Sequence, residues 1–273
     1  MVMYPTRYHR PRDVCDAVRL FAAGEDATYL AGGHTLLPTM KLRLAHPSDL
    51  IDLCVLAELH GISTQDDVLS IGATTLHREV ADSSVVRRWI PALAGLAASI
   101  GDRHVRNRGT IGGSVANNDP AADYPAAVLG LGAIVVTDRR RIAADAFFVS
   151  MYETALEPGE IIRRIEFPIP EQAGYAKFRS AASRYAIAAV FISKRGAIVR
   201  VTVTGAGSAG VFRLRAMEQA LEKDFLPASV ALSQIDSGAL LSDLNGTPAY
   251  RANLIAVLAR RALGRLGEAQ SYK

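Results

Sequence analysis

The sequence predicts an α+β protein in two parts that divide near residue 170. Residues 1–170 alternate short apolar segments with amphipathic ones and carry most of the glycine-rich turns, which is typical of mixed helix and sheet. Pro168 and Pro170 interrupt any regular element, because proline supplies no backbone N–H. Two strand-like segments and two helical segments follow, which predicts a smaller C-terminal domain with an antiparallel sheet and helices over residues 171–273.

The first part contains elements that can be recognised by their spacing. Apolar residues recur at helical spacing over residues 11–23 and stop at Gly24, and residues 91–100 form a second helical segment that ends at Gly101. Short apolar segments beside turn residues predict strands at residues 27–30 and 50–53 and buried strands at residues 68–71 and 134–136.

The second part begins with strand segments at residues 186–192 and 198–204, joined by a turn at 194–196. In the later strand valines alternate with Arg200 and two threonines, which predicts an antiparallel strand with one exposed face. Helices are predicted at residues 214–223 and 248–265. Thr247 can serve as the N-cap of the last helix, and Pro248 fits its first turn.

Composition excludes several classes of protein. The chain has a net charge of +4 and lacks the concentrated basic charge that nucleic-acid binding requires. Cys15 and Cys54 can form neither a disulfide framework nor the four-thiolate site of an ordinary iron–sulfur cluster. No apolar run reaches about 18 residues, and the N-terminus lacks the apolar core of a signal peptide. We therefore expect a cytoplasmic protein with no transmembrane segment.

Residues 205–210 (GAGSAG) have the spacing of a nicotinamide-dinucleotide fingerprint. The strand before them alternates, whereas the first strand of such a fold is buried on both faces, and too few residues follow Gly210 to complete its sheet. We interpret the segment as a tight strand-to-helix turn.

Two other glycine segments are better candidates for a dinucleotide site. In residues 31–38 (AGGHTLLP) the glycines follow a predicted strand, where successive backbone N–H groups can bind a pyrophosphate and Thr35 adds a hydroxyl. In residues 107–123 (NRGTIGGSVANNDPAAD) few side chains can enter a core, so the amides and hydroxyls of this segment can line a cavity, and Asp123 can accept hydrogen bonds from a ribose or from loop amides. Ordinary turns and a surface loop are the alternatives.

These segments, with Met40 and Lys41 after the first and Arg106 before the second, resemble the two FAD-binding motifs of the medium subunit of molybdenum hydroxylases. Aerobic carbon monoxide dehydrogenase and the bacterial three-subunit xanthine dehydrogenases belong to that family. The resemblance continues through residues 160–168, 175–190 and 250–263. It implies a two-part FAD-binding domain of the PCMH/VAO type at residues 1–170, with subdomains of about 1–55 and 56–170, and a flavoprotein C-terminal domain at 171–273.

The resemblance also implies which residues bind FAD. They are Ala31, Gly32, Gly33, His34, Thr35, Leu36, Thr110, Ile111, Gly112, Gly113, Ser114, Asp123, Ile162, Lys177 and Tyr185. A solvated charge at Lys177 and an ordinary strand residue at Tyr185 are the alternatives for those two positions. Arg184 stands where relatives often carry aspartate, and Ser114 where they commonly carry asparagine.

The implied function is electron relay, with no catalytic residue and no metal site on this chain. Substrate would be hydroxylated on a large molybdopterin-binding subunit, and electrons would pass through 2Fe-2S clusters of a small subunit to FAD and then to an external acceptor. A dimer of heterotrimers is expected in the cytoplasm, where the complex could lie against the inner face of the membrane. A stand-alone flavin oxidoreductase of the same fold and a non-catalytic assembly module are the alternatives.

Overall fold

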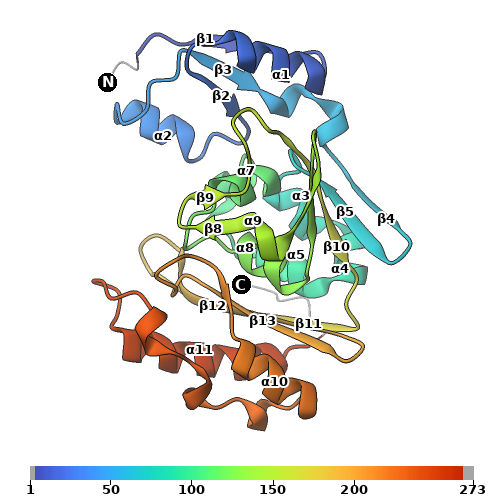
Figure 1. Ribbon diagram of the computed structural model, residues 1–273, viewed down its shortest axis with the longest axis vertical. Coiled ribbons are helices and arrows are strands. Elements are labelled where there is room, and N and C mark those ends of the chain that lie inside the picture. The colour runs from blue at the N-terminus through green and yellow to red at the C-terminus, as the bar shows by residue number, and fades with distance from the viewer. Residues whose placement is uncertain (1–3, 267–273) are drawn as a thin grey trace.

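The computed structural model describes residues 4–266 and arranges them in three stacked layers that follow chain order (Figure 1). An N-terminal layer lies at one end, a larger middle layer follows, and the C-terminal layer lies at the other end. Helices and strands alternate along the chain, and two of the three main sheets are antiparallel throughout. The predicted α+β class is confirmed.

The N-terminal layer is a parallel sheet in the order β1-β3-β2, against which helix α1 packs. Helix α1 begins later than predicted, because the Asp13 carboxylate caps it by accepting the Asp16 N–H at 2.7 Å. The elements are β1 (Arg7–His9), α1 (Val14–Ala23), β2 (Ala27–Leu30), α2 (Leu36–Lys41) and β3 (Asp49–Asp52), followed by the 3₁₀ turns η1 (Leu53–Val55) and η2 (Ala57–Leu59). Strand β2 confirms the segment predicted at 27–30.

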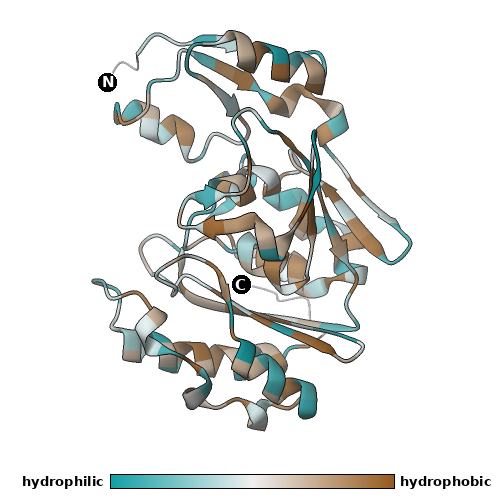
Figure 2. Cartoon of the chain, viewed as in Figure 1, coloured by the Kyte–Doolittle hydropathy of each residue, from teal (hydrophilic) through white to brown (hydrophobic). Residues whose placement is uncertain are grey.

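The middle layer is an antiparallel sheet in the order β4-β5-β10-β6-β7, packed against short apolar helices. Its strands are β4 (Ile62–Gln65), β5 (Val68–Gly72), β6 (Ile134–Thr137), β7 (Arg141–Ala143) and β10 (Ile162–Pro168), with the hairpin β8 (Phe148–Ser150) and β9 (Glu153–Thr154) beside it. Its helices are α3 (His77–Asp82), α4 (Ser84–Trp89), α5 (Pro91–Ala98), α6 (Arg103–Arg106), α7 (Ile111–Asn117), α8 (Tyr124–Gly130) and α9 (Ala144–Phe147). Hydrophobic residues gather on the central helices and on the strands they cover (Figure 2).

The C-terminal layer is an antiparallel sheet in the order β11-β12-β13-β14, with two helices on its outer face (Figure 1). The strands are β11 (Gln172–Arg179), β12 (Ala186–Arg195), β13 (Ile198–Thr204) and β14 (Phe212–Arg213), and the helices are α10 (Arg215–Lys223) and α11 (Pro248–Leu263), with the 3₁₀ turns η3 (Pro227–Ser229), η4 (Leu232–Gln234) and η5 (Ser237–Ala239) between them. The predicted cap is confirmed, since the Thr247 hydroxyl accepts the Tyr250 N–H at 3.2 Å. The turn after β12 lies at Gly196, slightly later than predicted.

The predicted exposed face of β13 is wrong. Thr202 and Thr204 are fully buried, because the inner face of the sheet packs on α8 of the middle layer. Their hydroxyls donate to the carbonyl oxygens of Ala126 and Ala122, each at 2.7 Å, so the polar side chains are satisfied without water. Alternation of valine and threonine therefore marks two buried faces of different polarity here.

The sequence analysis rejects a nicotinamide-dinucleotide loop at residues 205–210, and the topology of the sheet agrees. Strand β13 before them pairs antiparallel on both sides. The segment returns as β14 and does not open a helix directly, so the predicted strand-to-helix turn is a strand-to-strand turn. Gly205 adopts φ +81° and its N–H donates to the Pro120 carbonyl at 2.8 Å, which ties the turn to the middle layer.

One apolar core continues from the middle layer into the C-terminal sheet. It includes the α5 and α8 side chains together with Tyr175 of β11 and Phe191 of β12. The division near residue 170 therefore crosses a shared core, and the assignment of separate domains there stays a prediction.

Candidate functional site

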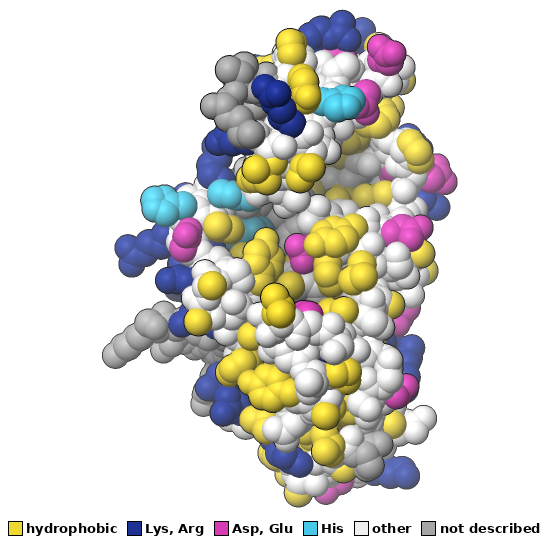
Figure 3. All heavy atoms as spheres, turned by 90° about the vertical axis from the view of Figure 1, so that its left-hand side faces the viewer, with side chains coloured by type: hydrophobic (Ala, Val, Ile, Leu, Met, Phe, Trp, Pro, Cys, Tyr) yellow, Lys and Arg dark blue, Asp and Glu magenta, His cyan; other side chains and the backbone are white. Residues whose placement is uncertain are grey.

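A cavity of about 580 Å³ opens between the N-terminal layer and the middle layer. The molecule is visibly hollowed there, with hydrophobic side chains along the border of the hollow (Figure 3). The cavity is lined by the loop after β2, the segment from Gly109 into α7, the first residues of β10, and Ser183–Tyr185 between β11 and β12. The two glycine segments, far apart in sequence, thus meet at one site. Every predicted site residue except Ile111 and Lys177 lines this cavity.

The first glycine segment presents unpaired amides to the cavity. Among the described residues, no acceptor is bonded to the backbone N–H groups of residues 32–36. Gly33 adopts φ +72°, and a Cβ on Gly32 would lie 2.3 Å from the Arg108 carbonyl oxygen. The glycines therefore let the loop turn sharply and lie directly on the second segment. Successive free N–H groups of this kind form an anion-binding concavity.

The second glycine segment does not offer its amides, and that part of the prediction is wrong. The N–H groups of Ile111 and Gly112 donate to the carbonyls of Thr75 (3.1 Å) and Ala73 (2.8 Å), and the Gly113 N–H donates to the Thr110 hydroxyl at 3.1 Å. The segment is the capped start of helix α7, which the sequence analysis treated as a loop.

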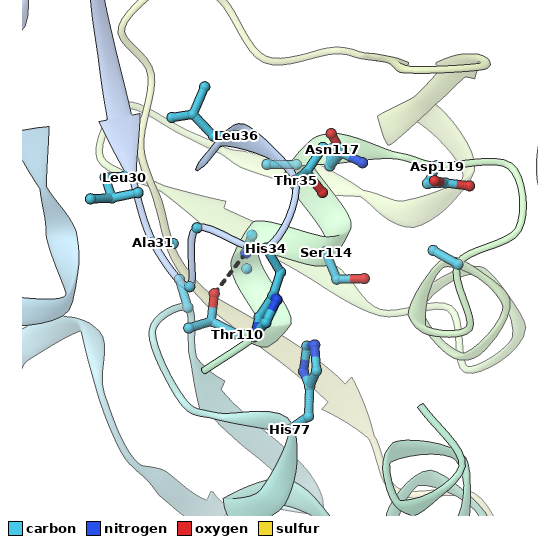
Figure 4. A pocket seen from close by; sticks show the side chains of 18 of the residues that line it. Leu30, Ala31, His34, Thr35, Leu36, His77, Thr110, Ser114, Asn117 and Asp119 are labelled. Carbon is cyan, nitrogen blue, oxygen red and sulfur yellow. Dashed lines mark hydrogen bonds between the residues drawn. The ribbon is translucent and has the colours of Figure 1, made fainter. Parts of the chain in front are cut away.

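The glycines of α7 serve close packing. A Cβ on Gly112 would lie 2.5 Å from the Cβ of Ala73. The hydroxyl of Ser114, in contrast, extends toward the cavity (Figure 4). This segment contributes hydroxyl groups and a close-fitting wall, while the anion-binding amides come from residues 32–36.

Asp123 lines the cavity, and both of its carboxylate oxygens are already bonded. Lys177 Nζ donates to one oxygen at 2.8 Å, and the Tyr175 hydroxyl donates to the other. The Lys177 and Asp123 side chains are 2% and 5% exposed, so this is a buried ion pair that joins α8 to β11. Lys177 therefore holds the cavity wall from behind and is not a solvated charge. Ile111 likewise points into the core and is fully buried.

The mouth of the cavity lies at the turn between β11 and β12. Tyr185 lines it and is 50% exposed, so one side of the ring is available to a ligand. Arg184 also lines the mouth, adopts φ +63°, and its guanidinium donates to the Gly101 carbonyl at 3.5 Å. Ile162, at the start of β10, lines the cavity with a buried apolar side chain.

Several lining residues were missed by the sequence analysis. They include Thr74, His77, Ile100, Glu160 and Ser183. His77 and Thr74 follow strand β5, where no glycine or charge pattern marks them. His77 is the first residue of α3 and its ring points into the cavity (Figure 4). Burial lowers the pKa of His77 to about 3, so the imidazole is neutral at physiological pH.

Glu160 is held in the cavity wall by four hydrogen bonds. Its buried carboxylate accepts from Arg140 Nε (3.0 Å) and Nη2 (2.9 Å), from the Thr137 hydroxyl (2.7 Å) and from the Glu157 N–H (2.9 Å). The Arg140 guanidinium lowers the pKa of Glu160 to about 2, from an ordinary value of 4.5. The carboxylate therefore stabilises the fold fully above about pH 4.5, and this contribution is lost as the pH falls toward 2.

Replacing Glu160 with glutamine should lower the free energy of unfolding by about 2–3 kcal/mol at pH 7. The difference in free energy of unfolding between the variant and the wild type should become smaller as the pH falls from about 4.5 to 2, because the wild-type carboxylate then takes up a proton. Urea denaturation at a series of pH values measures both effects. Glu25→Gln, at an exposed position, is the control and should change stability little. A stability difference that does not change with pH would contradict the conclusion that the ionised Glu160 carboxylate stabilises the fold.

Comparisons with known proteins agree on one family. The family described as "FAD binding domain in molybdopterin dehydrogenase" matches residues 4–170. The chain is 36% identical to the carbon monoxide dehydrogenase medium chain of Hydrogenophaga pseudoflava, over 96% of this chain and 97% of that one. The chain belongs to this family. It is also 34% identical to the nicotine 6-hydroxylase medium subunit of Paenarthrobacter nicotinovorans, over 96% and 97% of the two chains.

Solved structures show that the similarity covers nearly the whole chain, including residues after 170. Reconstituted CO dehydrogenase from Oligotropha carboxidovorans matches with a TM-score of 0.88 at 32% identity, over 98% of this chain and 99% of that one. Quinoline 2-oxidoreductase from Pseudomonas putida 86 matches with a TM-score of 0.88 at 26% identity, over 98% of each chain. The C-terminal layer is therefore shared with these proteins, beyond the residues that the family description covers.

The site fits the cofactor that the family binds. Free amides at residues 32–36 suit a pyrophosphate, and a Cβ on Gly32 would fill the junction between the two segments. The cavity volume lies within the range of about 300–1,000 Å³ that is usual for ligand sites. The cofactor of the chain is FAD, and the chain is an electron-transfer subunit of the oxidoreductase class of molybdenum hydroxylases. In the described part of the chain, no helix is long and apolar enough to cross a membrane.

Proposed function

We propose that this chain holds FAD between its N-terminal and middle layers and relays electrons from 2Fe-2S clusters of a partner subunit to an external acceptor. The observation that carries the proposal is the meeting of the unpaired amides of residues 32–36 with the capped start of α7 at one cavity. When bound, FAD accepts electrons singly and releases them singly or in pairs. The chain itself supplies binding, orientation and exclusion of water.

Different residues of the cavity bind different parts of the cofactor. Amides of residues 32–36 and the Thr35 hydroxyl bind the pyrophosphate, in an arrangement that needs no lysine or arginine. Ser114 adds a hydroxyl at the start of α7, and Ile162 adds an apolar wall. Tyr185 covers the mouth with its ring. Asp123, fixed by Lys177 and Tyr175, shapes the wall between these groups.

The partners follow from the relatives. Those relatives are named as medium chains or medium subunits, which supports an assembly with a large molybdopterin-binding subunit and a small 2Fe-2S subunit. We extend this to a dimer of heterotrimers in the cytoplasm. Native purification tests the assembly, and the large and small subunits should co-purify with this chain in equal amounts. Elution of the native chain alone would contradict it.

The full chain, purified and incubated with FAD, should be yellow and should release flavin absorbance on denaturation at close to one flavin per chain. A pyrophosphate bound to the free N–H groups of residues 32–36 should stabilise the folded chain, so FAD should also raise the melting temperature. Absorbance spectroscopy and thermal denaturation measure both. Riboflavin, which has no pyrophosphate, is the control ligand and should raise the melting temperature less. A colourless protein in excess FAD would refute the proposal, and turnover of a reduced substrate by the chain alone would favour a stand-alone oxidoreductase.

A further inference from the structure

His77 is a buried polar side chain in the cavity that no predicted binding motif includes. It begins helix α3, is 5% exposed, and points toward the space beside His34 and Ser114 (Figure 4). Its Nδ1 atom is enclosed by protein and has no hydrogen-bond partner among the described residues, so Nε2 is the ring nitrogen left for a ligand. Two neighbouring buried groups, the hydroxyls of Thr74 and Tyr124, are also unpaired within residues 4–266. Enclosed polar atoms without a partner destabilise a fold, so the position of His77 in the cavity wall is not explained by its contribution to stability.

The surroundings of the His77 ring fix its position. Its backbone N–H donates to the Gly109 carbonyl at 2.9 Å, and a Cβ on Gly109 would lie only 2.4 Å from His77 Nε2. The Tyr124 ring packs against the imidazole with centroids 5.3 Å apart. Gly109 is therefore required for the ring to occupy this place, and the ring has little freedom to turn away. A binding group that is held in this way needs no reorganisation when its ligand arrives.

The charge state of His77 suits hydrogen bonding to a neutral polar group. Burial is the main factor that disfavours the imidazolium, with smaller effects in the same direction from the neighbouring His34 and Arg106 side chains, and no hydrogen bond joins a carboxylate to the ring among the described residues. Burial lowers the pKa of His77 to about 3. A neutral imidazole carries one donor and one acceptor nitrogen, so it can pair with a carbonyl, an N–H or a hydroxyl.

We propose that His77 is a further FAD-binding residue, whose ring makes a hydrogen bond to a polar edge of the cofactor and so fixes how deeply the cofactor enters the cavity. This inference rests on the proposed function, because it takes FAD as the occupant of the cavity. It adds to that function a positioning group on α3, an element outside both glycine segments.

The test is FAD binding by the full chain after removal of flavin, followed by titration and by melting of the flavin-free protein. His77→Leu and His77→Phe remove the hydrogen bond, and His77→Gln keeps both a donor and an acceptor. The dissociation constant should rise about tenfold or more in the first two variants and less than about threefold in the third. His104→Leu, at an exposed histidine on α6, is the matched control and should bind as the wild type does.

The flavin-free His77→Leu protein should melt at or above the temperature of the wild type, because an unpaired buried polar atom has been removed. Wild-type affinity in both apolar variants would overturn the inference, as would equal losses in His77→Gln and His77→Leu. Failure of the wild type to bind FAD would refute the proposed function as well. FAD binding by the wild type with unchanged affinity in the variants would refute the role of His77 alone.

Discussion

Replacing Lys177 with methionine is expected to lower the free energy of unfolding by about 3–5 kcal/mol. The substitution leaves the Asp123 carboxylate buried, and within residues 4–266 the Tyr175 hydroxyl is its one remaining side-chain partner. An uncompensated charge in this position loses water without gaining a counterion. Urea denaturation of the flavin-free chain at pH 7 measures the effect. Asp82→Asn breaks an exposed ion pair with Arg87 and should cost less than about 1 kcal/mol.

A double variant separates lost charge from lost packing. Replacing Asp123 with asparagine in the Lys177→Met background removes the second charge, and it should restore part of the stability because no unpaired ion remains buried. FAD affinity should also fall in Lys177→Met, since one of the two side-chain bonds that hold Asp123 to β11 is lost and only the bond from Tyr175 remains among the described residues. Stability of Lys177→Met within about 1 kcal/mol of the wild type would mean that the lysine is solvated, contrary to its burial.

Local elements of the fold could be predicted from the sequence because their signals are local. Strand β2, strand β13 and the Thr247 cap all lie where spacing and capping residues indicate. The second buried face of β13 could not be predicted in this way. Thr202 is buried because the sheet packs on α8, which is distant in sequence and whose Ala126 carbonyl accepts the Thr202 hydroxyl.

In the candidate site, too, local features could be predicted from the sequence, and features that depend on distant partners could not. Glycines mark the loop at residues 32–36, and the unpaired amides there agree with the sequence interpretation. In the second segment glycine is needed for close packing, because Gly112 lies directly against Ala73, a residue distant in sequence. His77 and Tyr175 carry no pattern of their own, because their roles come from partners that only the fold supplies.

Replacing Gly32 with alanine is expected to weaken FAD binding at least about 100-fold. The new Cβ would lie 2.3 Å from the Arg108 carbonyl oxygen and 2.7 Å from the Gly109 Cα, and neither backbone atom can yield without separating the two glycine segments. A displacement of about 1 Å in a binding constellation has an effect of this order. Titration of the flavin-free chain with FAD measures it.

Gly264→Ala is the matched control for this substitution. Its Cβ would meet nothing closer than 3.6 Å and its φ is −74°, so both FAD affinity and melting temperature should stay at wild-type values. Gly33→Ala should give an intermediate loss, because the Leu37 side chain can move but the positive φ remains strained at about 1 kcal/mol. Wild-type FAD affinity in Gly32→Ala, with the flavin-free protein still folded, would show that the cofactor does not depend on the contact between the two segments.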